Sequence, residues 1–187
     1  NCRVDVIPNF VDPAMFSRVA RSGGLRQELG GGKPVLMHIS NFRPVKRVRD
    51  VVRVFAKVRE RVPCVLVMVG DGPDRGGAEE EARALGVSAD VRFVGKIDAV
   101  APLLAAADVY VFPSESESFG LSALEALASG VPVVAARVGG LPDVVRDGVT
   151  GALLPLGDVD GMADAVVRFL DPVRWASASK AAEEDAH

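Results

Sequence analysis

The chain has 187 residues, a formal net charge of −3 and 49% hydrophobic residues, enough to bury a sizeable core in one domain. A weakly negative chain has no general electrostatic attraction to nucleic acid or to membrane surfaces. Its two cysteines, Cys2 and Cys64, show neither metal-site spacing nor a dense disulfide framework, which favours a reduced, cytoplasmic setting. No apolar run approaches the ~20 residues needed to span a bilayer, and no signal peptide is visible.

Valine- and leucine-rich runs alternate along the chain with segments of helical periodicity. In chain order we expect a strand at 4–7, a glycine-rich mobile loop at 22–33, a strand at 34–40, a helix at 47–61, a strand at 64–69, a helix at 79–85, a strand at 91–94, a helix at 99–107, a strand at 108–113, a helix ending at Gly130, a strand at 131–136, a helix at 141–145, a strand at 151–154 and a helix at 159–170. The alternation predicts an α/β fold with a doubly wound, Rossmann-like parallel sheet. From Asp171 onward the sequence is polar and predicts a helical or frayed tail.

The segment from Ser114 to Gly130 is the most informative part of the chain. It contains two carboxylates, Glu117 and Glu125, across a loop and the first turns of a helix. Glu125 borders the apolar helix face marked by Leu121 and Leu124, where an unpaired carboxylate is costly to bury. Considered alone, a pair of solvated or capping glutamates is the commoner explanation.

A basic loop follows the strand expected at 34–40. It runs from Asn41 to Arg47 and includes Arg43 and Lys46. Ligands of doubly wound sheets bind outside the carboxyl ends of the strands. Arginine and lysine at that edge suit a diphosphate, whereas the alternative is a solvated basic loop.

The segment E-S-F-G-L-S-A-L-E-A-L-A-S-G-V-P-V-V resembles the signature of family-four (group 1) retaining glycosyltransferases of the GT-B fold. The resemblance implies that Glu117 contacts the donor sugar and that Glu125 holds the ribose hydroxyls of the nucleotide. A vicinal diol offers two donors, and an ionised carboxylate is acceptor-only. The amides around Phe119 lie at a helix N-terminus, which favours a diphosphate.

The same resemblance extends to the other loops that follow strands. Lys46 matches the lysine of the family pattern G-R-x-x-x-x-K, whereas Asn41 replaces its usual arginine and Arg43 could supply that charge. The candidate catalytic residues are Glu117, Lys46 and Arg43. The candidate donor-binding residues are Asn41, Arg47, Gly70, Gly72, Lys96, Ile97, Ser118, Phe119, Gly120, Leu121 and Glu125. His38, within an expected strand, is interpreted as a core histidine.

The resemblance also implies that the chain is the C-terminal, donor-binding half of a two-domain enzyme. Residues 1–22 would form the interdomain connection and first strand, 33–172 the nucleotide-sugar-binding domain, and 173–187 a C-terminal tail. The opening Asn1-Cys2-Arg3, without an initiator methionine, suits a piece of a longer protein. The implied partners are a nucleotide sugar and an N-terminal acceptor-binding domain, with the oligomeric state, a homo-oligomer included, left open. No metal or other cofactor is expected.

Within the family, three segments are most similar to the N-acetylglucosaminyl malate synthases of bacillithiol assembly. They are H-I-S-N-F-R-P-V-K-R-V, E-S-F-G-L and R-V-G-G-L-P. This implies transfer of N-acetylglucosamine from its UDP donor to a small acceptor such as L-malate.

Two alternatives remain. One is a glycoside hydrolase that uses Glu117 and Glu125, which would not need the basic loop; the other is a non-catalytic nucleotide-sugar-binding module.

Overall fold

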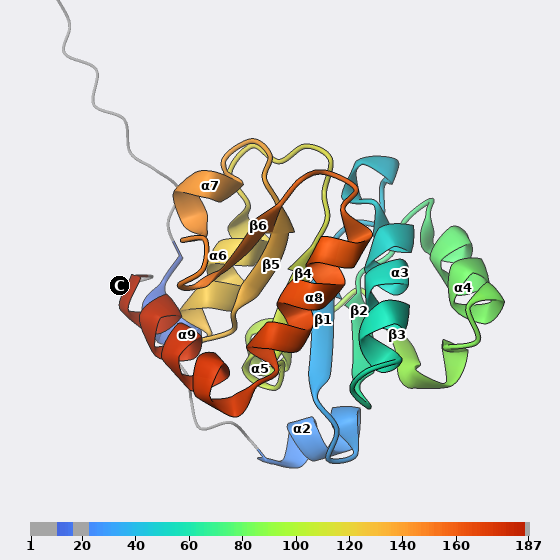
Figure 1. Cartoon of the computed structure of the whole chain (residues 1–187), viewed down its shortest axis with the longest axis horizontal. Helices are drawn as coiled ribbons and strands as arrows, with labels where there is room; N and C mark the ends of the chain where they lie inside the picture. Colours follow the sequence, from blue (N-terminus) through green and yellow to red (C-terminus); the bar gives the residue numbers. More distant parts are fainter. Residues whose placement is uncertain (1–10, 17–22, 186–187) are drawn as a thin grey trace, which may run out of the picture.

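The computed structural model describes residues 11–16 and 23–185. In these ranges six parallel strands form one sheet: β1 (Val35–Ile39), β2 (Val65–Val69), β3 (Val91–Gly95), β4 (Val109–Phe112), β5 (Val133–Ala136) and β6 (Gly151–Leu154). Their order across the sheet is β3-β2-β1-β4-β5-β6 (Figure 1). The parallel, doubly wound sheet predicted from the sequence is confirmed. The strand expected at 4–7 lies outside the described residues.

Helices cover both faces of this sheet. They are α1 (Pro13–Phe16), α2 (Gly23–Gly30), α3 (Val48–Arg59), α4 (Arg75–Ala84), α5 (Ala101–Ala105), α6 (Leu121–Ala128), α7 (Leu141–Val144), α8 (Val159–Phe169) and α9 (Pro172–Asp185), with short 3₁₀ turns η1 (Pro44–Lys46) and η2 (Ser88–Asp90). Side chains of α3, α4 and α8 pack with Leu36 on one face, and those of α5, α6 and α7 pack with Met37 on the other. Neighbouring residues of β1 therefore lie in separate cores, as a parallel sheet buried on both faces requires.

The chain changes faces between β3 and β4. The connections through α3 and α4 lie over one face, whereas the connections through α5, α6 and α7 lie over the other. Strands β1 and β4 are nevertheless hydrogen-bonded neighbours, with Leu36 opposite Val109. The loops that follow β1 and β4 therefore start side by side and diverge, which forms the crevice at a topological switch point.

The glycine-rich segment expected as a mobile loop contains a helix, so that expectation is wrong for residues 23–30. Helix α2 is held by its contacts with the rest of the domain: Leu29 is buried, and Leu25 packs against the same core. Arg26 also forms an ion pair of 2.6 Å with Asp108. These long-range contacts outweigh the low helix propensity of glycine, which is a weak determinant by itself.

One further boundary differs from the sequence expectation. Helix α4 begins at Arg75, before the expected start at residue 79. The polar segment after Asp171, expected as a helical or frayed tail, forms helix α9. Its Ala178 and Ala182 are buried, and its Trp175 indole donates to the carbonyl of Asp108 at 2.8 Å. Within the described part of the chain, no helix is long and apolar enough to cross a membrane.

His38 is a core histidine, as the sequence suggested. Its side chain is fully buried in β1, with Nδ1 at 2.9 Å from the carbonyl of Val111 and Nε2 at 2.8 Å from the hydroxyl of Ser40. Burial lowers the pKa of His38 from 6.5 to about 4, and the nearby charge of Lys46 acts in the same direction. The imidazole is therefore neutral at physiological pH.

A close approach at Gly139 fixes the loop that follows β4. Gly139 has a φ of 51°, and a Cβ added there would lie 1.7 Å from the carbonyl oxygen of Glu117. The next amide, that of Gly140, donates to the same oxygen at 3.1 Å. The loop after β5 thus supports the backbone of Glu117 directly, and a residue with a side chain cannot replace Gly139 without moving it.

We predict that Gly139→Ala destabilises the chain more than Gly148→Ala. Both positions have positive φ, but a Cβ at Gly148 would meet no atom within 4 Å. Both variants incur the left-handed strain of about 1–2 kcal/mol. Gly139→Ala should lose a further ~1–3 kcal/mol from the clash, measured by urea unfolding at neutral pH. Equal losses of unfolding free energy in the two variants would show that the contact between Gly139 and the carbonyl of Glu117 does not constrain the loop.

We also predict a pH-dependent stability contribution from His38. Because its pKa is near 6.5 unfolded and about 4 folded, the unfolded state binds more protons between these values. The contribution is complete above about pH 6.5 and is lost as the pH falls toward about 4. His38→Phe removes this contribution. As the pH falls through that window, the difference in unfolding free energy between the parent chain and this variant should therefore decrease by up to about 1.4 kcal/mol per pH unit. Parallel stability curves would contradict the burial of a neutral histidine.

Candidate functional site

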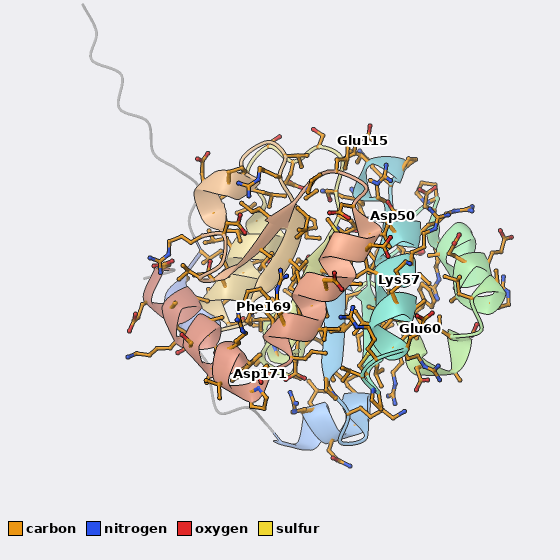
Figure 2. All side chains as sticks on the ribbon, in the orientation of Figure 1. Asp50, Lys57, Glu60, Glu115, Phe169 and Asp171 are labelled. Atoms are coloured by element: carbon orange, nitrogen blue, oxygen red, sulfur yellow. The ribbon has the colours of Figure 1, made fainter. Side chains whose placement is uncertain are left out.

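The candidate site lies where the loops after β1 and β4 meet. A backbone hydrogen bond of 2.8 Å from Glu115 to Val45 joins the two loops directly. Figure 2 shows Glu115 at the same end of the domain as Asp50, which lies in the first turn of α3, and Asp171 at the opposite end. The site therefore occupies the carboxyl edge of the sheet, where the sequence placed it.

An ion pair between Lys46 and Glu117 connects the loops through their side chains. The Nζ–Oε2 distance is 2.5 Å, and the two side chains are only 18% and 16% exposed. The Lys46 ammonium also lies 5.5 Å from the centre of the Phe112 ring, within the range of a cation–π contact. A pair so largely withdrawn from water is less screened than the surface ion pairs of the same protein.

The remaining cations of the basic loop are not used in the same way. Arg43 is exposed and makes no ion pair with any described residue. Arg47 donates from Nε to the carboxylate of Asp50 at 2.7 Å. The buried Asp50 also accepts a hydrogen bond from Arg53 at 3.0 Å. The structure thus brings Lys46 to Glu117, leaves Arg43 at the surface and engages Arg47 with α3.

Helix α6 presents its N-terminus beside this ion pair. Gly120, with a φ of 92°, precedes the first helical residue, Leu121. In the described structure the backbone N–H groups of Phe119, Gly120 and Leu121 donate to no protein acceptor, and Ser118 before them is exposed. Free amides and the helix dipole together favour an anion at this position.

Glu125, one turn further along α6, has no donor among the residues that the structure describes. It is half-buried, and burial raises the pKa of its carboxyl group. Among the described residues its side chain makes no hydrogen bond or ion pair, in contrast to that of Glu117. An unpaired carboxylate in this environment costs free energy, so Glu125 is suited to receive donors from a ligand.

Tyr110 is a site-forming residue that the sequence reasoning missed. Its hydroxyl donates to the carbonyl of Ile39 at 2.9 Å and accepts from the amide of Ile39 at 3.2 Å. Burial raises the pKa of this phenol, with smaller contributions from Glu125 and Glu117 in the same direction, so the hydroxyl stays protonated. A tyrosine in a buried strand carries no sequence signal for such a role.

The loops after β2 and β3 contribute in different ways. Gly70 and Gly72 lie against the backbone of the basic loop, where an added Cβ would come 1.8 Å from the oxygen of Ser40 and 2.0 Å from that of Asn41. They support this loop through their backbone. Lys96 and Ile97, both candidate donor-binding residues, are exposed just after β3, which lies two strands away from β1.

The sequence matches a known protein family over most of its length. The family "Glycosyl transferases group 1" matches residues 33–172. The N-acetyl-alpha-D-glucosaminyl L-malate synthase of Bacillus anthracis is 42% identical over 172 residues, which cover 91% of this chain and 45% of that protein. The D-inositol 3-phosphate glycosyltransferase of Kribbella flavida is 39% identical over 203 residues, or 98% of this chain and 47% of that protein. The chain spans about half the length of these relatives.

Solved structures agree with this assignment. Anabaena Alr3699/HepE, crystallised with UDP and glucose, superposes with a TM-score of 0.87 at 28% identity, covering 97% of this chain and 51% of that one. A glycosyltransferase from Rickettsia africae has the same TM-score of 0.87 at 17% identity, covering 97% of this chain and 52% of that one, and so shares the fold. The glycosyltransferase resemblance inferred from the sequence is confirmed: the chain belongs to the group 1 glycosyl transferase family.

Proposed function

We propose that this chain is the donor-binding half of a retaining glycosyltransferase and binds the diphosphate of a nucleotide sugar between the basic loop and α6. One arrangement carries the proposal: Lys46 lies beside Glu117, at the N-terminus of α6 and ahead of Glu125. Within residues 11–16 and 23–185, the amides at that N-terminus have no acceptor and the carboxylate of Glu125 has no donor. This arrangement offers positive potential for a diphosphate and an acceptor for a diol. An isolated surface glutamate pair would need neither feature.

Each side chain has a distinct part in this proposal. The amides around Phe119 and the ammonium of Lys46 bind the diphosphate. Glu125 accepts hydrogen bonds from the two ribose hydroxyls, which offset the cost of its burial. Glu117 contacts the sugar once the diphosphate shares the charge of Lys46. Arg43, exposed on the same loop, adds a cation at the rim.

The proposed donor is UDP-N-acetylglucosamine and the proposed acceptor a small molecule such as L-malate. Support comes from the Bacillus anthracis relative, whose name states that product, and from Anabaena HepE, which was crystallised with UDP and glucose. Because the chain corresponds to about half of these proteins, we propose that the acceptor site is supplied by a second, N-terminal domain. Transfer requires both halves.

The contribution of this half to transfer is electrostatic. As the bond between the sugar and the diphosphate breaks, negative charge accumulates on the departing UDP. Lys46 and the N-terminal amides of α6 are already oriented toward that charge, so little reorganisation is needed when it forms. The departing diphosphate in turn accepts the proton of the attacking hydroxyl, and the sugar keeps its anomeric configuration.

We predict that Lys46→Met, in a protein that contains both halves, lowers kcat by about 100- to 1000-fold, as is common when one charge stabiliser is lost. The matched control is Lys57→Met, on α3. Lys57 is also ion-paired, at 2.7 Å from Asp160, but it lies away from the carboxyl edge. Steady-state transfer assays should show near-parental activity for the control. Equal activity of the two variants would show that Lys46 does not contribute to transfer.

We further predict that the two glutamates separate nucleotide binding from sugar binding. Glu125→Gln should weaken bare UDP by about 10- to 150-fold, since a hydrogen bond to a charged group contributes about 1.5–3 kcal/mol. Glu117→Gln should bind bare UDP at least as well as the parent chain, because it releases Lys46, but should bind the UDP-sugar more weakly. Calorimetry with both ligands on both variants gives the comparison.

The same titrations, together with assays of glycoside hydrolysis and of transfer, distinguish the alternative functions. A glycoside hydrolase would release sugar from a glycoside and show no UDP binding in the parent chain. A non-catalytic module would bind the nucleotide sugar yet give no transfer when both halves are present. Weakening of bare UDP to the same extent by Glu117→Gln and Glu125→Gln would contradict the assigned division of roles.

A further inference from the structure

We propose that His38 and Ser40 are positioning residues, which hold the loop after β1 in the conformation that brings Lys46 to Glu117. This inference deepens the proposed function, on which its consequence for nucleotide binding rests. Neither side chain has a place in the proposed contacts with the donor. Their role follows from a chain of hydrogen bonds that runs from β4 through the core to the start of the loop.

The first step is the direction of these hydrogen bonds. The carbonyl of Val111 can only accept, so its contact of 2.9 Å with His38 requires a proton on Nδ1. In the neutral imidazole Nε2 then accepts from the hydroxyl of Ser40, 2.8 Å away. The hydroxyl oxygen of Ser40 accepts in turn from the amide of Phe42 at 3.3 Å. Every donor in this sequence has one acceptor, and it ends on the loop backbone.

The second step is the conformation of the residue at the end of this chain. Phe42 has a φ of 44°, a left-handed conformation that is rare for a bulky side chain. Its ring is fully buried and stacks 6.2 Å from the imidazole of His38. Such strain persists only where the surroundings over-determine it. Here the hydrogen bond to Ser40 and the ring contact both originate from the same two residues.

The third step connects this turn to the candidate site. Among the described residues only Phe42 and Arg47 combine a side chain with positive φ, and they enclose the short turn η1 that contains Lys46. The carbonyl of Phe42 is also fixed, by the amide of Asp74 at 3.0 Å. The left-handed turn at Phe42 therefore sets where the loop leaves β1 and where Lys46 lies.

The decisive variant is Ser40→Ala, which leaves both the amide of Phe42 and Nε2 of His38 without their partner. Ser40→Thr keeps the hydroxyl and serves as the conservative rescue, since Ser40 continues the strand: its backbone N–H donates to the carbonyl of Val69 at 3.1 Å. Ser114→Ala is the matched control. Ser114 is a buried serine two residues after β4, and its hydroxyl has no hydrogen-bond partner in the described structure.

Two measurements on the 187-residue chain need no ligand. Nitrogen-15 spectra of the imidazole should show the Nδ1–H tautomer of His38 in the parent chain. Amide hydrogen exchange of residues 41–47 should be faster in Ser40→Ala and parental in Ser40→Thr and Ser114→Ala. An Nε2–H tautomer, or unchanged exchange in Ser40→Ala, would overturn the inference.

The third measurement is the affinity for UDP at low salt. In Ser40→Ala the dissociation constant should rise about three- to tenfold, the range expected for one net hydrogen bond, with thermal unfolding checked in parallel. Ser40→Thr should restore the affinity. Loop exchange that responds as predicted while the parent chain binds no UDP would reject the proposed function and leave the positioning role supported. Parental UDP affinity in Ser40→Ala would reject the role in binding.

Discussion

Because β1 and β4 are hydrogen-bonded neighbours whose connections leave over opposite faces, the two loops that follow them begin side by side. This parallel pairing is the constraint on which the site depends. It brings Lys46 within 2.5 Å of Glu117, although 71 residues separate them along the chain. It also places the N-terminus of α6 beside the basic loop. A different strand order would scatter the same residues over separate edges of the sheet.

Polar groups inside the domain divide into two kinds. His38 has a partner at each ring nitrogen, Tyr110 bonds both backbone groups of Ile39, and Asp50 binds two arginines. Such satisfied groups stabilise and orient the loops. Glu125 differs, because it is half-buried, its pKa is raised and no described residue donates to it. Local departures of this sort are expected at functional positions, where a ligand completes the arrangement.

The strand pattern, and with it the edge of the sheet at which the candidate site lies, were predictable because they depend on local sequence. Buried parallel strands appear as short valine-rich runs, and the loops after them can be located by counting. The helix at 23–30 was not predictable, because contacts with Asp108 and the core outweigh its glycines. Nor was the ion pair of Arg47 with Asp50, because Arg47 adopts a left-handed conformation that the sequence does not indicate. The hydroxyl of Tyr110 reaches Ile39 across 71 residues of sequence, beyond what periodicity can indicate.

The central claim is that a nucleotide diphosphate binds between the basic loop and α6. Its most direct test is a titration of the isotope-labelled chain with UDP, followed through the amide resonances. We expect the largest shifts at Phe119, Gly120 and Leu121 and in residues 43–47. The indole N–H of Trp175, hydrogen-bonded to Asp108 at the opposite edge of the sheet, should not move. Shifts concentrated around Trp175, or none at millimolar UDP, would contradict the account.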